Sequence, residues 1–209
     1  MRILLIEPAK PDVSLAGEDV FIYEPLALEY VAAGVLDEHE VKILDMRLDK
    51  NLESVLADFR PHVVGATAFT VHVNGVKRLL ERVKAQHTDV LTVVGGHHAT
   101  VAPEDFTSPG IDLVVVGEGV FAFRGIVGRL QRGEEFGGIP GVVPAGACGQ
   151  PVTNGGTHTD LDALPFPARS LTSQYRRQYY SEWMRPLASI RTTTGFERPT
   201  TVMKSTSDR

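Results

Sequence analysis

The sequence predicts an α/β fold, a Rossmann-like or flavodoxin-like doubly wound parallel sheet of five strands in the order 2-1-3-4-5, with a C-terminal hairpin and linker extension. Apolar runs of strand length alternate with segments of helical period, which is the pattern of βαβ units in a sheet buried on both faces. Crossovers between parallel strands are right-handed, and the open doubly wound sheet is the simplest assembly that they allow. Such a sheet binds its ligand beyond the carboxyl ends of the strands.

Each expected strand is an apolar run bounded by turn or helix-start residues. The first ends at Glu7-Pro8, because proline cannot donate a ladder hydrogen bond and restricts the residue before it. The expected strands cover residues 2–6, 40–44, 63–67, 90–94 and 113–116.

The expected helices have apolar residues on one stripe. The first covers 24–36, with Pro25 in the tolerated first turn, and the second covers 51–59, with Asn51 as its N-cap. The third covers 72–86, where apolar residues repeat at helical spacing and basic residues occupy the outer face. A short helix begins near Pro103, and a last helix covers 120–132.

The composition changes after Gly133. Two short apolar runs, 139–144 and 151–153, flank a turn at 145–149 and predict a hairpin. Residues 160–167 read as an extended linker, because two closely spaced prolines discourage regular structure. Three parts are therefore expected, at 1–135, 136–170 and 171–209.

Charge and cysteine content exclude several classes of partner and site. A formal net charge of −5 gives no attraction to nucleic acid or to anionic membranes. One cysteine, Cys148, excludes an internal disulfide and any zinc or iron–sulfur site built from several thiolates of this sequence. No segment reads as a signal peptide or membrane span, so the expected location is cytoplasmic.

Small residues or hydroxyls follow three of the expected strands. They lie in Thr67-Ala68-Phe69-Thr70, in Gly95-Gly96-His97-His98-Ala99-Thr100 and in Gly117-Glu118-Gly119. Any one of these segments alone is explained by turn formation. Together they open onto one crevice, and glycine lets a backbone approach a ligand closely. A ligand across this edge of the sheet is therefore expected.

These segments resemble a known family. The runs Val93 to Thr100, Pro103-Glu104 and Ile111 to Gly119 are similar to the cobalamin-binding domain that precedes the barrel of cobalamin-dependent radical SAM enzymes. The likeness extends over about 1–195 and includes residues 161–169, which resemble the family's linker into the barrel. It implies a cobalamin-binding domain at 1–135, a hairpin and linker at 136–170, and a truncated or divergent start of the radical SAM region at 171–209.

The resemblance also assigns cofactor-binding residues. It implies that Thr67, Phe69, Thr70, Gly95 and Gly96 line the path of the cobalamin tail. Gly117, Glu118 and Gly119 are expected to border the tail or the corrin ring, and His98 matches the family's histidine. His97 stands where the family usually has proline, and it completes the expected set.

Two departures refine the expectation. Methionine-synthase-like domains carry Asp-x-His-x-x-Gly after strand one, whereas residues 7–12 here contain no histidine, so no histidine ligand to cobalt is expected from that loop. Radical SAM enzymes also need Cys-x-x-x-Cys-x-x-Cys, but Phe196, Thr200 and Met203 occupy the matching positions. No iron–sulfur cluster and no independent radical chemistry are therefore expected in this sequence, which ends before a barrel.

Other candidate sites are weaker. A metal site at His97 and His98, with His72 as third ligand, competes with a simple arrangement of one exposed and one hydrogen-bonded histidine. Cys148 has no charged neighbour to activate it and reads as an incidental thiol. The tyrosines and arginines of 175–180 favour a domain or subunit contact over nucleic acid.

The main functional expectation is a binding module that holds and presents a corrinoid, without catalytic residues of its own. One alternative is a subunit that completes a methyltransferase in trans, with a separate radical SAM barrel as partner; self-association of the chain is a further candidate contact. Others are a flavodoxin-like nucleotide- or flavin-binding protein, although the glycine-rich loop for a phosphate is missing after strand one, and a degenerate domain without ligand.

Overall fold

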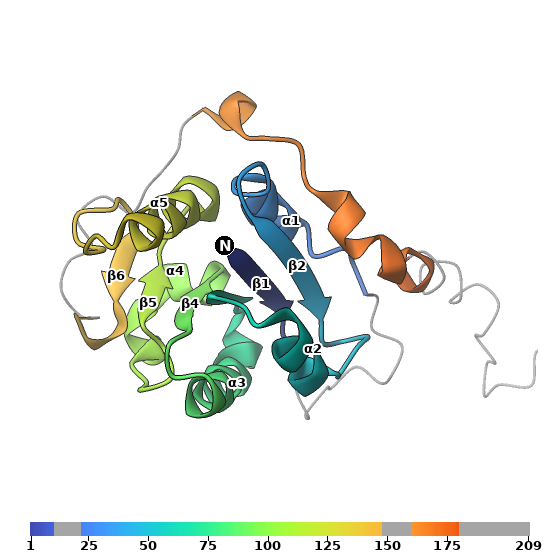
Figure 1. Cartoon of the computed structure of the whole chain (residues 1–209), viewed down its shortest axis with the longest axis horizontal. Coiled ribbons are helices and arrows are strands. Elements are labelled where there is room, and N and C mark those ends of the chain that lie inside the picture. Colours follow the sequence, from blue (N-terminus) through green and yellow to red (C-terminus); the bar gives the residue numbers. More distant parts are fainter. Residues whose placement is uncertain (11–21, 148–159, 180–209) are drawn as a thin grey trace, which may run out of the picture.

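The computed structural model describes residues 1–10, 22–147 and 160–179 and contains one twisted sheet between two layers of helices (Figure 1). The strands are β1 (Arg2–Glu7), β2 (Glu40–Asp45), β3 (Val63–Thr67), β4 (Leu91–Gly95), β5 (Leu113–Val115) and β6 (Val142–Pro144). Their order in the sheet is β2-β1-β3-β4-β5-β6. The predicted fold class and the predicted order of the first five strands, all parallel, are confirmed.

The sheet has a sixth strand that the sequence did not predict as part of it. β6 pairs antiparallel with β5, with Val143 opposite Val114. It comes from the first run of the predicted hairpin. The first three residues of the predicted turn form a 3-10 turn, Ala145–Ala147, whereas residues 148–149 and the second run lie outside the described residues. A run of three paired residues next to glycine-rich chain carries too little periodicity to identify its partner strand.

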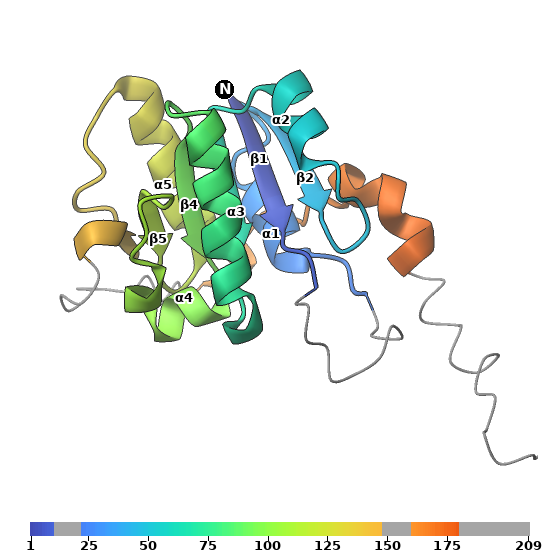
Figure 2. The same cartoon turned by 90° about the horizontal axis from the view of Figure 1, so that it is seen from below.

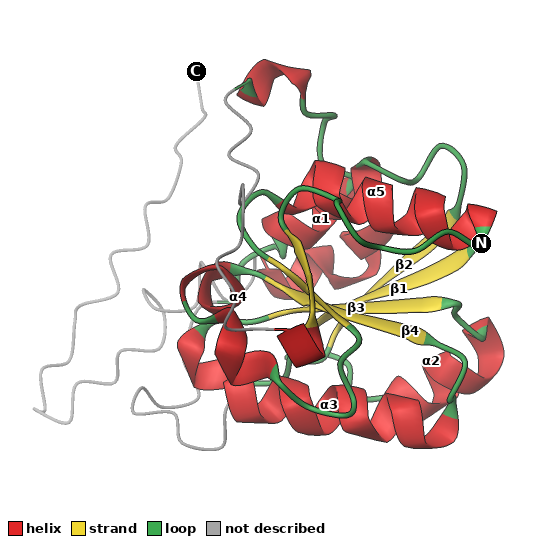
Figure 3. Cartoon of the chain, turned by 90° about the vertical axis from the view of Figure 1, so that its left-hand side faces the viewer, coloured by secondary structure: helices red, strands yellow, loops and turns green. Residues whose placement is uncertain are grey.

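Helices α1 (Leu26–Ala33) and α5 (Gly119–Arg132) cover one face of the sheet, and α2 (Leu52–Phe59) and α3 (Val73–Gln86) cover the other (Figure 3). Alternate residues of β1 show this division. Leu4 and Ile6 pack in the core beneath α2 and α3, whereas Ile3 and Leu5 pack on the side of α1 and α5. Both faces are therefore buried, as the apolar strands predicted.

The carboxyl edge of the sheet carries a short helix, α4 (His97–Val101), followed by a 3-10 turn at Pro103–Phe106. The sequence predicted no helix between residue 94 and Pro103, and this was wrong, since His97 and His98 are both helical. A helix of five residues has little stability of its own, so its formation depends on contacts with the rest of the fold. Among the described residues no helix is both long and apolar enough to cross a bilayer.

Residues 168–179 return to the sheet and run beside α1 and β2 (Figures 1 and 2). The backbone N–H of Ala168 donates to the carbonyl of Glu29 at 3.0 Å, and the Thr172 hydroxyl donates to the Glu29 carboxylate at 2.5 Å. Glu29 is fully buried, and this burial raises its pKa. This segment therefore packs on the α/β domain, while the predicted division of the chain at residue 171 stays a prediction.

Candidate functional site

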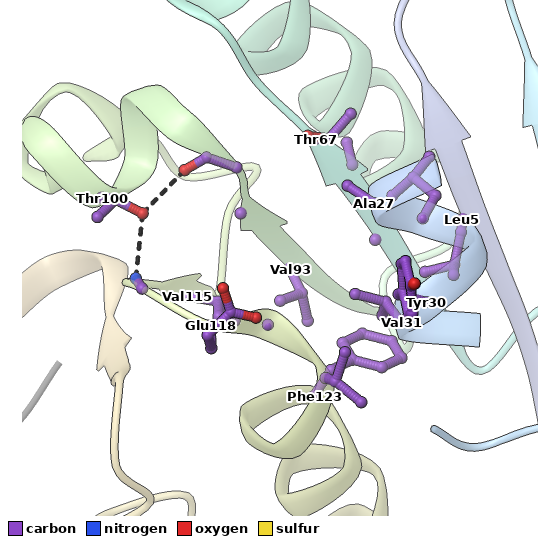
Figure 4. Close-up of a pocket in the computed structure, with 18 of the residues that line it drawn as sticks. Leu5, Ala27, Tyr30, Val31, Thr67, Val93, Thr100, Val115, Glu118 and Phe123 are labelled. Atoms are coloured by element: carbon purple, nitrogen blue, oxygen red, sulfur yellow. Dashed lines mark hydrogen bonds between the residues drawn. The ribbon is translucent and has the colours of Figure 1, made fainter. Parts of the chain in front are cut away.

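A cavity of about 760 Å³ lies between the sheet and the helices α1 and α5 (Figure 4). Its floor is a row of three neighbouring strand residues, Leu5, Gly65 and Val93, which are paired across β1, β3 and β4. Phe123 of α5 closes one side, and the missing side chain at Gly65 keeps the floor open beneath it. The cavity therefore runs from the carboxyl ends of the strands to the middle of the sheet.

The mouth of the cavity is built from the turns after β3, β4 and β5. Gly96 has φ of 101°, and a Cβ there would lie 2.5 Å from the Thr67 hydroxyl oxygen and 2.8 Å from the Ala68 nitrogen. Only glycine fits such a close approach of two backbones. The Gly117 N–H donates to the Thr100 hydroxyl, which donates to the Gly96 carbonyl, each at 3.0 Å (Figure 4). These bonds fix the two turns against each other.

Most of the predicted site residues border this cavity. Those that line it are Thr67, Gly95, Gly96, His97, Gly117, Glu118 and Gly119. Phe69, Thr70 and His98 lie on the same edge of the sheet but outside the cavity lining. The binding roles of all ten residues stay predictions.

One wall of the cavity was missed by sequence reasoning. It consists of residues of α1, namely Leu26, Ala27, Tyr30 and Val31, with Phe123 of α5 on the other side. Apolar residues at helical spacing read as core whether they face a sheet or a cavity. The one sequence feature that could have indicated this wall is the position of Leu26 and Ala27 at the start of a helix beside the ligand edge. In the structure the Leu26 side chain is exposed and not part of the core.

The two adjacent histidines have different surroundings. His98 is buried, with Nδ1 3.0 Å from the Thr70 hydroxyl and Nε2 2.8 Å from the Asp105 carboxylate. His97 is exposed, and its ring lies 6.4 Å from that of Phe69 between centroids. One exposed and one hydrogen-bonded histidine is the simpler of the two arrangements that the sequence allowed. Within the described ranges no three His, Cys, Asp or Glu side chains gather as metal ligands.

A buried charged cluster lies where β1 and β2 end. Arg47 donates to both carboxylate oxygens of Asp45, at 2.8 and 2.6 Å, and its guanidinium lies 3.9 Å from Glu7. The Tyr179 hydroxyl donates to Asp45 at 2.9 Å. Burial raises the pKa of Glu7 to about 7, against the lowering effect of Arg47. The cluster joins the C-terminal segment to the edge of the sheet that bears the cavity.

Glu7→Gln should stabilise the fold at pH 8 by roughly 2 kcal/mol. The folded protein holds a proton on Glu7 up to about pH 7, whereas the unfolded chain releases it near 4.5. Unfolding free energy therefore falls as pH rises from 4.5 to 7, and glutamine removes this loss. Denaturant melts of both proteins at pH 5 and pH 8 measure the difference.

The matched control is Glu53→Gln, which changes an exposed carboxylate on α2 that pairs with Arg82. It should move stability by less than about 0.5 kcal/mol at either pH. An unchanged difference between pH 5 and pH 8 in Glu7→Gln would contradict the assignment to Glu7.

Comparisons with known proteins give a family match. The family described as the B12 binding domain matches residues 14–127. An uncharacterized methyltransferase of Pyrococcus horikoshii is 36% identical over 153 residues, which are 68% of this chain and 32% of the relative. The anaerobic magnesium-protoporphyrin IX monomethyl ester cyclase of Rubrivivax gelatinosus is 28% identical over 143 residues, 64% of this chain and 25% of the relative.

A solved structure shares the fold. It is the radical S-adenosylmethionine methyltransferase TsrM from Kitasatospora setae, with cobalamin and a [4Fe-4S] cluster bound. It aligns with a TM-score of 0.56 at 21% identity, over 68% of this chain and 27% of its own. The present chain thus spans a third or less of the length of these relatives.

Proposed function

Because this chain belongs to the B12-binding domain family, we propose that its cavity receives the nucleotide tail of cobalamin while the corrin ring lies over the carboxyl ends of the strands. The observation that carries this proposal is the cavity itself. It is deep, mostly apolar and open at the edge where doubly wound sheets bind ligands.

The residues present fit such a ligand. Five glycines line the cavity, at positions 65, 95, 96, 117 and 119, so the backbone can contact a bulky group without side chains in between. The deeper walls are apolar and suit an aromatic base. Polar groups of Thr67, Thr100 and Glu118 are confined to the mouth and suit the sugar and phosphate of a tail.

The corrin ring is proposed to rest on the edge beside the mouth. Phe69, Val71 and Val101 are exposed there, at 53%, 67% and 62%, although all three are apolar. Exposed apolar side chains next to a cavity are typical of a surface that a ligand or partner covers. The proposed role of Phe69, which lies outside the cavity lining, is therefore a contact with the ring, whereas His97 lines the cavity and stays a proposed contact of the cofactor.

The proposed role of this domain is to orient cobalamin and to shield it. When bound, cobalamin supplies the cobalt–carbon chemistry, and no acid or base from this domain is needed for that. We expect a radical SAM barrel to face the exposed surface of the ring. Because this sequence has one cysteine, the thiolates of an iron–sulfur cluster must come from residues outside it, in the same protein or in a partner.

Cobalamin retention tests the proposal. The chain is mixed with hydroxocobalamin, desalted, and analysed by visible spectrum and cobalt content per chain. About one cobalt per chain is expected, with a spectrum changed from that of the free cofactor. Cobalt below about one tenth per chain would overturn the proposal and favour a degenerate domain.

A further inference from the structure

Thr70, His98 and Asp105 form a hydrogen-bonded chain in which the buried His98 ring links two exposed side chains. The His98 ring is fixed from three sides, by Thr70 at Nδ1, by Asp105 at Nε2 and by the edge-on ring of Phe106, 5.7 Å away between centroids. His98 is 7% exposed, whereas Thr70 and Asp105 are both exposed, the Asp105 side chain at 53%; of these two ends, Thr70 directly follows Phe69 on the edge proposed for the corrin.

This hydrogen-bonded chain of side chains determines whether the Thr70 hydroxyl donates a hydrogen bond to His98 or accepts one from it. A carboxylate only accepts hydrogen bonds, so His98 must carry its proton on Nε2 to donate to Asp105. In a neutral imidazole Nδ1 is then an acceptor, and the Thr70 hydroxyl proton must point to it. The outer side of the Thr70 oxygen is left with lone pairs alone.

We infer that Thr70 is a specificity-determining residue, which accepts a hydrogen bond from a primary carboxamide on the rim of the corrin and rejects a carboxylate at that position. This inference rests on the proposed function, since it places the corrin on the edge that bears Thr70. The rim of cobalamin carries several primary carboxamides, each of which offers N–H donors. Incompletely amidated corrinoids carry carboxylates there, and a carboxylate facing a fixed acceptor has no proton to share.

If the three side chains served only to hold α4 in place, the direction of the Thr70 hydrogen bond would not matter. The His98 backbone N–H already donates to the carbonyl of Ala68, just after β3, at 3.0 Å, so α4 is attached without the Thr70–His98–Asp105 side chains. The hydrogen bonds among Thr70, His98 and Asp105 additionally fix the orientation of the Thr70 hydroxyl, which is exposed to solvent. That orientation matters only to a group that binds outside the domain.

The test compares affinities for cobalamin and for its separated monocarboxylic acids, which are made by mild acid hydrolysis. In the parent chain at least one isomer should bind about 10-fold more weakly than cobalamin. In Thr70→Val, which keeps the shape and removes the hydroxyl, that ratio should fall to about 2. The ratio is a readout that loss of stability does not move.

Asp105→Asn tests the Thr70–His98–Asp105 chain without changing the Thr70 side chain itself. An amide can donate as well as accept, so it no longer fixes the His98 proton, and the ratio should fall in the same direction. The matched control is Thr107→Val, whose hydroxyl donates to backbone carbonyls of Glu104 and Ala145. It should keep the parent ratio.

The outcomes separate two claims. Cobalamin binding with an unchanged isomer ratio in both Thr70→Val and Asp105→Asn would overturn the role of Thr70 and leave the proposed function intact. A parent chain that retains no cobalamin would overturn the proposed function, and the inference with it.

Discussion

Gly95→Leu is expected to weaken cobalamin binding by at least about 100-fold, equal to ~2.7 kcal/mol, in a chain that stays folded. Gly95 lines the cavity and follows Val93 by two residues, so a side chain there points to the same face of the sheet as Val93. A Cβ at this position has ordinary contact with Val115, at 3.6 Å, and no positive φ opposes it. The rest of a leucine then occupies space proposed for the tail.

The site makes Gly95 a better choice than Gly96 for this experiment. A side chain at Gly96 would collide with the backbone of Ala68, so loss of binding could reflect loss of structure. At Gly95 an apolar side chain enters an apolar cavity, which should keep or raise stability. Affinity is measured by titration of hydroxocobalamin, and folding by circular dichroism and thermal melting.

Gly75→Leu is the matched control. Gly75 lies in α3 on the opposite face of the sheet, and nothing lies within 4 Å of a Cβ placed there. The same substitution should leave affinity unchanged. A folded Gly95→Leu protein that binds cobalamin as tightly as the parent would show that the cavity does not hold the tail.

The strands were predictable because a parallel sheet buried on both faces leaves a distinct pattern. β3 (Val63–Thr67) was predicted with its bounds, since it is a short run of apolar and small residues that follows Pro61. α4 was not predicted, because Gly96 and two histidines give no helical signal. Its helical form depends on contacts with the rest of the fold, such as the bond from the His98 backbone N–H to the Ala68 carbonyl, which sequence spacing alone does not specify.

The mouth of the cavity could be predicted from the sequence, whereas its α1 wall could not. Glycines after strands identify the mouth, because glycine is required where a turn must be tight or a ligand close, as the positive φ of Gly96 and Gly117 shows. The α1 wall carries no comparable mark. Tyr30 and Val31 would have the same sequence pattern if they packed directly on the sheet.

The C-terminal segment shows a further limit. The tyrosines near residue 175 predicted a contact, and Tyr179 makes one, but its partner Asp45 is 134 residues away in sequence. Nothing in the local pattern of either residue identifies the other. Long-range polar pairs of this kind become visible only once the fold is known.

Comparison of cobalamin with cobinamide, which has the corrin ring but lacks the nucleotide tail, tests the proposed place of the tail most directly. Burial of on the order of 120 Å² of apolar tail surface in the cavity gives ~3 kcal/mol, or more than 100-fold in affinity. Cobalamin should therefore bind at least about 100-fold more tightly than cobinamide in equilibrium titrations of the same chain. Equal affinities for the two corrinoids would contradict the placement of the tail in the cavity between α1, α5 and the sheet.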